Sequence, residues 1–140
     1  MKYFAWAAVS LGLLVVAPSA LDAQQGPPAR IELGQNYPNP FNPETTIPFT
    51  LPADVFADGH RPVVSLRIYN VLAQLVAVPI LQGSGEPMEN LALDWNGTGR
   101  YSAYWDGKVR GTGAEAPSGV YVYQLVVDGH RETNRMTIIK

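Results

Sequence analysis

One loop of the sequence has the spacing of oxygen ligands that a calcium site requires. Asp94, Asn96 and Thr98 alternate and are followed by Gly99, as in the first half of an EF-hand loop. The second half does not fit, because Trp105 stands where such a loop needs a bidentate glutamate and strand-like segments replace the flanking helices. We therefore interpret the segment as a turn and expect no metal site.

The other residues that could do chemistry are dispersed along the chain. His60 and His130 each lie beside a glycine and an arginine, with no second metal ligand nearby. The glycine pairs at 97/99 and 111/113 lack the strand-to-helix setting of a phosphate-binding loop. No serine has the surroundings of a nucleophile elbow, and the acidic residues are scattered. We expect neither an enzyme active site nor a cofactor.

Aromatic residues offer a further kind of site, a platform that stacks on sugars. The sequence places tyrosines at Tyr101, Tyr104, Tyr121 and Tyr123. Such a set fits a small carbohydrate-binding domain, but the same rings serve equally well as strand residues that face the core or a neighbouring strand. We favour the strand interpretation and keep carbohydrate binding as an alternative.

Composition limits the class of protein. The chain has 140 residues, of which 46% are apolar and 16% charged, and its ten Lys and Arg against twelve Asp and Glu give a net charge of −2. This balance predicts a packed single domain and no nucleic-acid partner. The chain has no cysteine, so neither disulfides nor thiolate metal sites are available, and an exported domain must be stabilised by its apolar core.

The first residues have the pattern of a secretory signal peptide. Lys2 precedes an apolar run over residues 4–16, which ends before small residues and is too short to span a bilayer comfortably. We predict a signal peptide over 1–23 with cleavage after Ala23; cleavage after Ser19 or Ala20 and an uncleaved anchor are the alternatives. A polar, proline-rich tether over 24–32 comes next, then one domain over 33–140. Membrane contact is expected only through the signal peptide during export.

The rest of the chain predicts an antiparallel sandwich. Residues 33–43 contain three prolines and predict an ordered loop, which Tyr37 and Phe41 are expected to pin to the core. Beyond it, short segments alternate between apolar and polar residues and are separated by turn residues, over 45–51, 63–70, 72–80, 88–95, 100–105, 118–127 and a last segment ending at 140. We predict an immunoglobulin-like β-sandwich of about seven strands, a hairpin at 128–129 and one helical turn within 52–57.

Four motifs together resemble a known family. They are Asn36-Tyr37-Pro38-Asn39-Pro40-Phe41-Asn42-Pro43 with the following strand 45–52, then Val64-Ser65-Leu66-Arg67-Ile68-Tyr69-Asn70, Trp105-Asp106-Gly107, and Pro117-Ser118-Gly119-Val120-Tyr121. This series resembles the C-terminal sorting domain of the bacterial type IX secretion system, also called the Por secretion tail. The later motifs are shared with the immunoglobulin-like domain of the flagellar hook-capping protein FlgD, and the opening motif favours the sorting type.

The resemblance implies a targeting module and no enzyme. Sorting domains follow a cargo and are recognised by outer-membrane secretion proteins, so it implies passage through the periplasm to the cell surface or outside. Here about seven tether residues stand in place of a cargo, which leaves a fragment, a decayed gene product or a free-standing module as alternatives. We also expect a monomer. A FlgD-like structural or binding module, in the periplasm or outside the cell, is the second hypothesis for the function.

The motifs also supply the candidate site residues. The framework motif consists of Asn39, Pro40, Phe41, Asn42, Pro43, Trp105, Asp106 and Gly107. The recognition candidates are Pro117, Gly119, Tyr121, Arg135 and Lys140, although Gly119 and Tyr121, like Trp105, also suit a structural role. Arg135 stands near the place of a lysine in the family's final segment. Pro117 and the terminal strand are expected at an exposed edge, which can bind a partner by strand addition.

Overall fold

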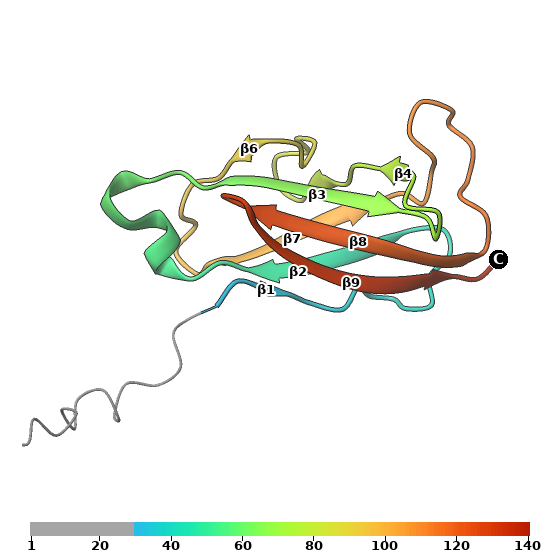
Figure 1. Cartoon of the computed structure of the whole chain (residues 1–140), viewed down its shortest axis with the longest axis horizontal. Helices are drawn as coiled ribbons and strands as arrows, with labels where there is room; N and C mark the ends of the chain where they lie inside the picture. Colours follow the sequence, from blue (N-terminus) through green and yellow to red (C-terminus); the bar gives the residue numbers. More distant parts are fainter. Residues whose placement is uncertain (1–29) are drawn as a thin grey trace, which may run out of the picture.

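The computed structural model describes residues 30–140, which fold as a β-sandwich (Figure 1). Two sheets with antiparallel strand pairing pack face to face, and this confirms the predicted all-β class. The predicted signal peptide 1–23, its cleavage after Ala23 and tether residues 24–29 lie outside the described residues. Within the described range, no helix has the length and apolar character needed to cross a membrane.

Sheet A consists of four strands in the order β1-β2-β7-β5. Their bounds are β1 Glu32–Leu33, β2 Thr45–Thr50, β7 Arg100–Trp105 and β5 Ile80–Leu81. The long central pair is β2 and β7, where Ile47 lies opposite Ala103 and both side chains are fully buried. Glu32 already pairs with Thr50, so the ordered sheet begins within the segment predicted as tether.

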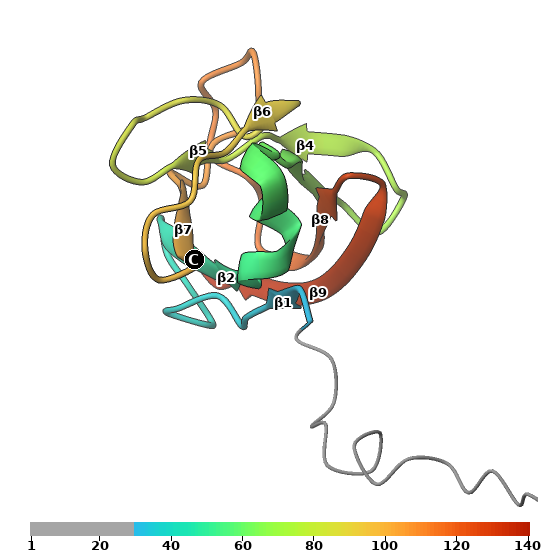
Figure 2. The same ribbon diagram turned by 90° about the vertical axis from the view of Figure 1, so that its left-hand side faces the viewer.

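Sheet B consists of five strands, four of them in the order β4-β3-β8-β9, with β6 beside the start of β3. Their bounds are β3 Val63–Tyr69, β4 Leu75–Ala77, β6 Leu91–Ala92, β8 Gly119–Val127 and β9 His130–Ile138. The last two strands form the predicted hairpin through Asp128 and Gly129, which both have positive φ. The 3₁₀ segment η1, Ala53–Gly59, is kinked at Ala57 and Asp58, whose backbone angles are not helical, and lies across the end of the sandwich opposite the C-terminus (Figure 2).

Alternation along the long strands builds the core. Tyr121, Tyr123, Leu125 and Val127 on β8 are buried, while the residues between them are exposed or half-buried. The same period places Val64, Leu66 and Ile68 of β3 inside. Each such aliphatic or aromatic side chain stabilises the fold by about 1.5–3 kcal/mol when it is fully buried. The two layers are therefore held together mainly by apolar contact.

The predicted strands at 72–80 and 88–95 are wrong in extent. The first is replaced by β4 and β5, which belong to different sheets, and the second keeps only β6. The reason for the first is a tight turn in which the Asn70 side-chain oxygen accepts hydrogen bonds from the backbone N–H groups of Leu72 and Gln74. Pro79 then separates β4 from β5, because proline has no backbone N–H to donate to a sheet.

A buried polar cluster attaches the proline-rich segment to both sheets. Asn36 is 2% exposed, and its backbone N–H donates to the Tyr123 hydroxyl at 3.1 Å. Its side-chain amide donates to the Thr45 hydroxyl at 3.1 Å and to the Pro38 carbonyl at 3.2 Å. The Tyr123 hydroxyl in turn donates to the Gly34 carbonyl at 2.7 Å, and burial raises the pKa of this tyrosine. Tyr123 therefore stays protonated and links β8 to the segment that joins β1 to β2.

The Tyr123 cluster yields a stability prediction. Tyr123→Phe removes the hydroxyl and leaves the Asn36 N–H without its partner inside the core, so the free energy of unfolding should fall by about 1–3 kcal/mol. Tyr104→Phe is the matched control, since the Tyr104 hydroxyl contacts only the exposed Glu44, and it should change stability by less than about 0.5 kcal/mol. Urea denaturation measures both; equal losses in the two variants would contradict the role given to Tyr123.

Candidate functional site

The motif residues named from the sequence meet at one end of the sandwich. The loop from β1 to β2, the loop from β7 to β8 and the C-terminus lie together there (Figure 1). We call this the C-terminal end and define it by residues 34–44, 106–118 and 139–140. The framework motif and four of the five recognition candidates belong to it or border it, and Arg135 lies apart on the face of β9.

Three aromatic rings form the base of the C-terminal end. Trp105 stands between Phe41 and Tyr121, with edge-to-face contacts at centroid distances of 5.5 and 5.9 Å. All three side chains are buried, at 3%, 2% and 6% exposure respectively. The Trp105 indole N–H donates to the Lys108 carbonyl at 3.0 Å, and the Tyr121 hydroxyl donates to the Pro117 carbonyl at 2.7 Å. Burial raises the pKa of Tyr121, so its hydroxyl remains a donor.

Gly107 joins two of the motifs by close packing. Its φ of 79° lies in the left-handed region, and a methyl group at its Cα would stand 1.8 Å from the Pro43 carbonyl oxygen. The Asp106 carboxylate accepts a hydrogen bond from the Lys108 backbone N–H at 3.0 Å and fixes the turn. Only glycine therefore allows the tryptophan turn to rest against the proline-rich segment.

The proline-rich segment lies along the outer edge of β9. The Phe41 N–H donates to the Thr137 carbonyl at 3.0 Å, and the Ile139 N–H donates to the Phe41 carbonyl at 3.2 Å. The Asn39 side-chain oxygen accepts from the Thr137 N–H at 3.1 Å, and the Gln35 amide donates to the Arg135 carbonyl at 3.0 Å. We call these contacts the β9 clamp.

The β9 clamp corrects the expectation of an exposed terminal edge. It occupies the Arg135 carbonyl, both backbone groups of Thr137 and the Ile139 N–H, which blocks the addition of a partner strand there. By the alternation of an antiparallel strand, Arg131 and Thr133 also direct backbone groups outward, and among residues 30–140 no backbone hydrogen bond reaches these groups from that side. The β9 clamp therefore covers only the second half of this edge.

Tyr37 differs from its predicted role as an anchor. Its side chain is 55% exposed, although its backbone forms a reciprocal pair of 2.9 Å hydrogen bonds with Thr46. This extended backbone pairing turns the neighbouring Asn36 inward and Tyr37 outward. Phe41 does pin the segment as predicted, and Asn36, which the sequence analysis missed, is the second anchor. The sequence feature that could have identified Asn36 as an anchor is a short polar side chain in a segment with few backbone N–H donors.

The remaining named residues make up the surface of the C-terminal end. Lys140 is held by a hydrogen bond from its N–H to the Ser118 hydroxyl at 3.0 Å and by an ion pair from its ammonium group to Glu115 at 3.3 Å. Gly119 has a φ of 152° and open space around its Cα. The other exposed named residues are Asn39, Pro40, Asn42, Pro43, Asp106 and Pro117.

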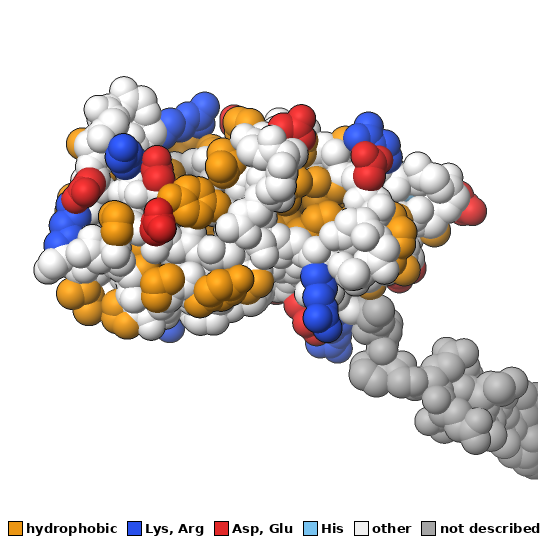
Figure 3. Space-filling model, turned by 180° about the vertical axis from the view of Figure 1, so that it is seen from behind, with side chains coloured by type: hydrophobic (Ala, Val, Ile, Leu, Met, Phe, Trp, Pro, Cys, Tyr) orange, Lys and Arg blue, Asp and Glu red, His pale blue; other side chains and the backbone are white. Residues whose placement is uncertain are grey.

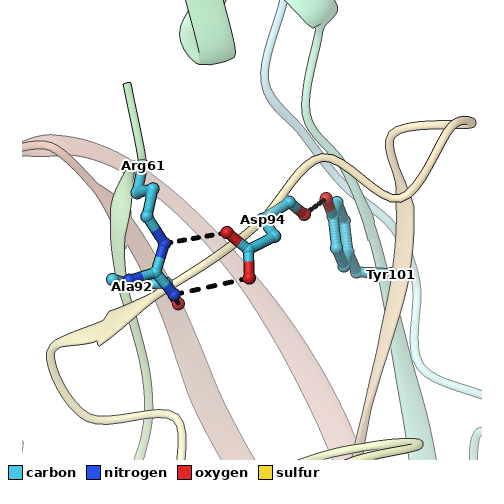
Figure 4. A network of polar contacts seen from close by, with 4 residues as sticks. All are labelled: Arg61, Ala92, Asp94 and Tyr101. Carbon is cyan, nitrogen blue, oxygen red and sulfur yellow. Dashed lines mark hydrogen bonds and ion pairs between the residues drawn. The ribbon is translucent and has the colours of Figure 1, made fainter. Parts of the chain in front are cut away.

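The opposite end holds the loop that resembled a calcium site. The Asn96 side-chain oxygen accepts hydrogen bonds from the backbone N–H groups of Thr98 and Gly99, so the turn itself uses this oxygen. The Asp94 carboxylate pairs with Arg61 at 2.8 Å, and the Asp94 carbonyl accepts from the Tyr101 hydroxyl at 2.6 Å (Figure 4). These contacts stabilise a turn, as interpreted from the sequence.

The two histidines and the four tyrosines do not gather into a site. His60 pairs with Asp128 at 2.8 Å, and His130 pairs with Glu132 at 2.9 Å, all partly exposed. Tyr121 and Tyr123 are buried, Tyr101 stacks on Phe49 inside the sandwich, and Tyr104 alternates to the outer face of β7. The four rings form no common platform for a sugar.

Comparison with known proteins identified a solved structure whose fold is similar to that of this chain. No protein-family model and no curated protein matches the chain. Among solved structures, the fold is similar to part of PorZ, described as an essential bacterial surface component of the type IX secretion system of the human oral bacterium Porphyromonas gingivalis. The two are 18% identical with a TM-score of 0.45, and the match covers 79% of this chain and 11% of the PorZ chain. The chain thus spans a small part of that protein's length.

The packing of Gly107 can be tested against a glycine of the same conformation. Gly107→Ala should destabilise the domain by about 1–3 kcal/mol more than Gly111→Ala, because both residues have a φ of 79° but only the Gly107 position meets a neighbouring atom. Chemical denaturation of the two variants measures the difference. Equal destabilisation would show that backbone strain alone acts at Gly107 and that the contact with Pro43 is unimportant.

Proposed function

We propose that this chain is a non-catalytic sorting module, recognised by the outer-membrane proteins of a type IX secretion system. The proposal starts from the four motifs that resemble the sorting family. Its support in the fold is that three of these motifs, the proline-rich segment, Trp105-Asp106-Gly107 and Pro117-Ser118-Gly119-Val120-Tyr121, contact one another at the C-terminal end. In this proposal the chain is a monomer that crosses the periplasm and works at or beyond the cell surface.

The β9 clamp is the observation that carries the proposal. The Asn-Pro-Phe-Asn-Pro segment binds the terminal strand through Phe41 and Asn39, which contact Thr137 and Ile139. A targeting signal at the end of a chain would be frayed if it had no such partner. Clamped in this way, the last residues are held in one conformation, and a receptor that binds them does not have to order a flexible tail.

The polar groups of the domain fit a role in binding rather than catalysis. Asp94, Asp128, Glu132 and Glu115 are each paired with a basic side chain at the surface. A general acid or base instead needs a positioned group within reach of a substrate in a cleft. We therefore assign the buried motif residues to the framework and the exposed recognition candidates Pro117, Gly119 and Lys140 to contact with the secretion machinery.

A reporter fusion tests the proposed function. Residues 24–140 are fused behind an exported reporter in a bacterium that has type IX secretion, and surface delivery is measured by protease accessibility on intact cells. Deletion of residues 135–140 should abolish delivery, but it also removes Met136 and Ile138, which are 1% and 3% exposed, and so disrupts the core. A second variant is needed that leaves the core intact.

Ile139→Ser with Lys140→Ser supplies that variant. Ile139 is 55% exposed and Lys140 is exposed too, so the double variant should fold and yet lower delivery several-fold. Val63→Ser with Arg100→Ser is the matched control, because it also removes one exposed apolar residue and one exposed cation, and it should leave delivery unchanged. Retention of the unaltered fusion in the periplasm would refute the sorting function and favour the FlgD-like alternative.

A further inference from the structure

The outward side of sheet B forms a surface that is covered at Ser65, where Asn90 lies against it, and open along the rest of β3, β8 and β9. Its long strands β3, β8 and β9 lie toward the viewer in Figure 1. Alternation turns Ser65, Arg67 and Tyr69 of β3 outward, because Val64, Leu66 and Ile68 fill the core. On β8 the outward residues are Val120, Val122, Gln124 and Val126, and on β9 they are Arg131, Thr133, Arg135 and Thr137. We call this surface the outer face of sheet B.

Strand register arranges these residues in rows across the sheet. One row contains Tyr69, Val122 and Arg135, and the next contains Arg67, Gln124 and Thr133. A third row contains Ser65, Val126 and Arg131. Arg131 and Arg135 are thus about 14 Å apart along β9, and Arg67 lies two strands away, about 10 Å from the midpoint between them. Three arginines therefore surround a centre made of Gln124 and two valines.

These three arginines are not neutralised by the domain. None of the outward positions on β3, β8 and β9 carries a carboxylate, and within residues 30–140 no ion pair involves Arg67, Arg131 or Arg135. This local charge contrasts with the net charge of −2 of the whole chain. It also contrasts with the opposite side of the molecule, where acidic, basic and apolar side chains are interspersed (Figure 3).

An apolar hollow adjoins the arginines. Its volume is about 340 Å³, and Tyr69, Val71 and Val122 contribute its apolar lining. The turn beside it exposes Val71 by 76% and Leu72 by 74%, and Leu75 and Val120 are also exposed at 41% and 45%. Exposed aliphatic side chains grouped beside a hollow are typical of a binding surface.

We propose that the outer face of sheet B binds a protein segment that presents two or more carboxylates beside an apolar side chain. The planar guanidinium groups suit carboxylates, since each can form two parallel hydrogen bonds with one of them. The hollow suits an apolar side chain of the same segment. This proposal rests on the proposed function, and it specifies the chemistry of the partner segment that the sorting module binds.

Other anionic partners fit this face less well. A nucleic acid requires a longer track of cations along its phosphates, and three arginines with a central Gln124 do not provide one. An anionic membrane would use the arginines and the exposed Val71 and Leu72, but it presents no single side chain that fills a hollow. Both are included as outcomes of the test.

A peptide selection tests the inference independently of secretion. The exported chain, residues 24–140, is immobilised and panned against a phage-displayed library of random peptides. The selected peptides should be enriched in Asp and Glu next to Leu, Ile or Phe, and their binding should weaken as salt concentration rises. Selected peptides without enrichment of acidic residues would overturn the proposal.

Charge-reversal variants locate the binding surface. Arg67→Glu, Arg131→Glu and Arg135→Glu together should weaken binding of one selected peptide by about tenfold or more, as three favourable pairs become repulsive. Arg30→Glu, Arg100→Glu and Lys108→Glu are the matched control, with the same change of net charge at exposed cations that form no ion pair within the described range, and should weaken binding less than about threefold. Replacement of the same three arginines by Gln checks, by thermal unfolding, that any loss does not come from misfolding.

Two further results would overturn the inference. Equal weakening by both triple variants would show that net charge acts without a docking face. Binding to vesicles of phosphatidylglycerol and phosphatidylcholine, or to single-stranded DNA, without peptide binding would assign the face to another anion. The sorting function fails separately, if the unaltered reporter fusion stays in the periplasm, so the two failures are distinguishable.

Discussion

The clamp between the proline-rich segment and β9 is the contact on which the rest of this structure depends. Proline lacks a backbone N–H, so residues 36–43 have few donors with which to attach themselves to a sheet. Those at Asn36, Tyr37 and Phe41 are all used, the first on the Tyr123 hydroxyl and the other two on strands of different sheets. The segment thus bridges the two layers at their shared edge. Loss of this bridge would leave the outer side of β9 and the rings of Trp105 and Tyr121 without cover.

In this arrangement the motif residues form two groups with different roles. The rings and Gly107 lie inside the C-terminal end and set its shape, whereas Pro117 and Lys140 lie at its surface. Keeping the shape of such a site therefore requires residues that no partner touches. The proposed docking face on sheet B differs in kind, because it depends on strand register rather than on loop packing. A domain of this size can present both surfaces at once, since one lies at the end of the sandwich and the other on its side.

Sequence patterns predicted the long strands and missed the features that tertiary contacts decide. β2, β7 and β8 follow from clear alternation, because each has one face in the core. The segment 72–80 also looks strand-like, but the side chain of Asn70 closes a turn and Pro79 separates β4 from β5. The exposure of Tyr37 and the covered edge of β9 could not be predicted, since both depend on pairings between segments that only the folded chain brings together. The grouping of the three outward arginines on one face could not be predicted from the sequence without the register of β3, β8 and β9.

The same long-range pairing has a consequence for biosynthesis. Phe41 near the start of the domain pairs with Thr137 and Ile139 at its very end, and β9 supplies one whole border of sheet B. The sandwich therefore cannot close until residues 137–139 have been synthesised, and contacts of this separation form slowly. A polypeptide truncated before Thr137 would lack the partners of Phe41 and the buried Ile138, so its sandwich would stay open at this border.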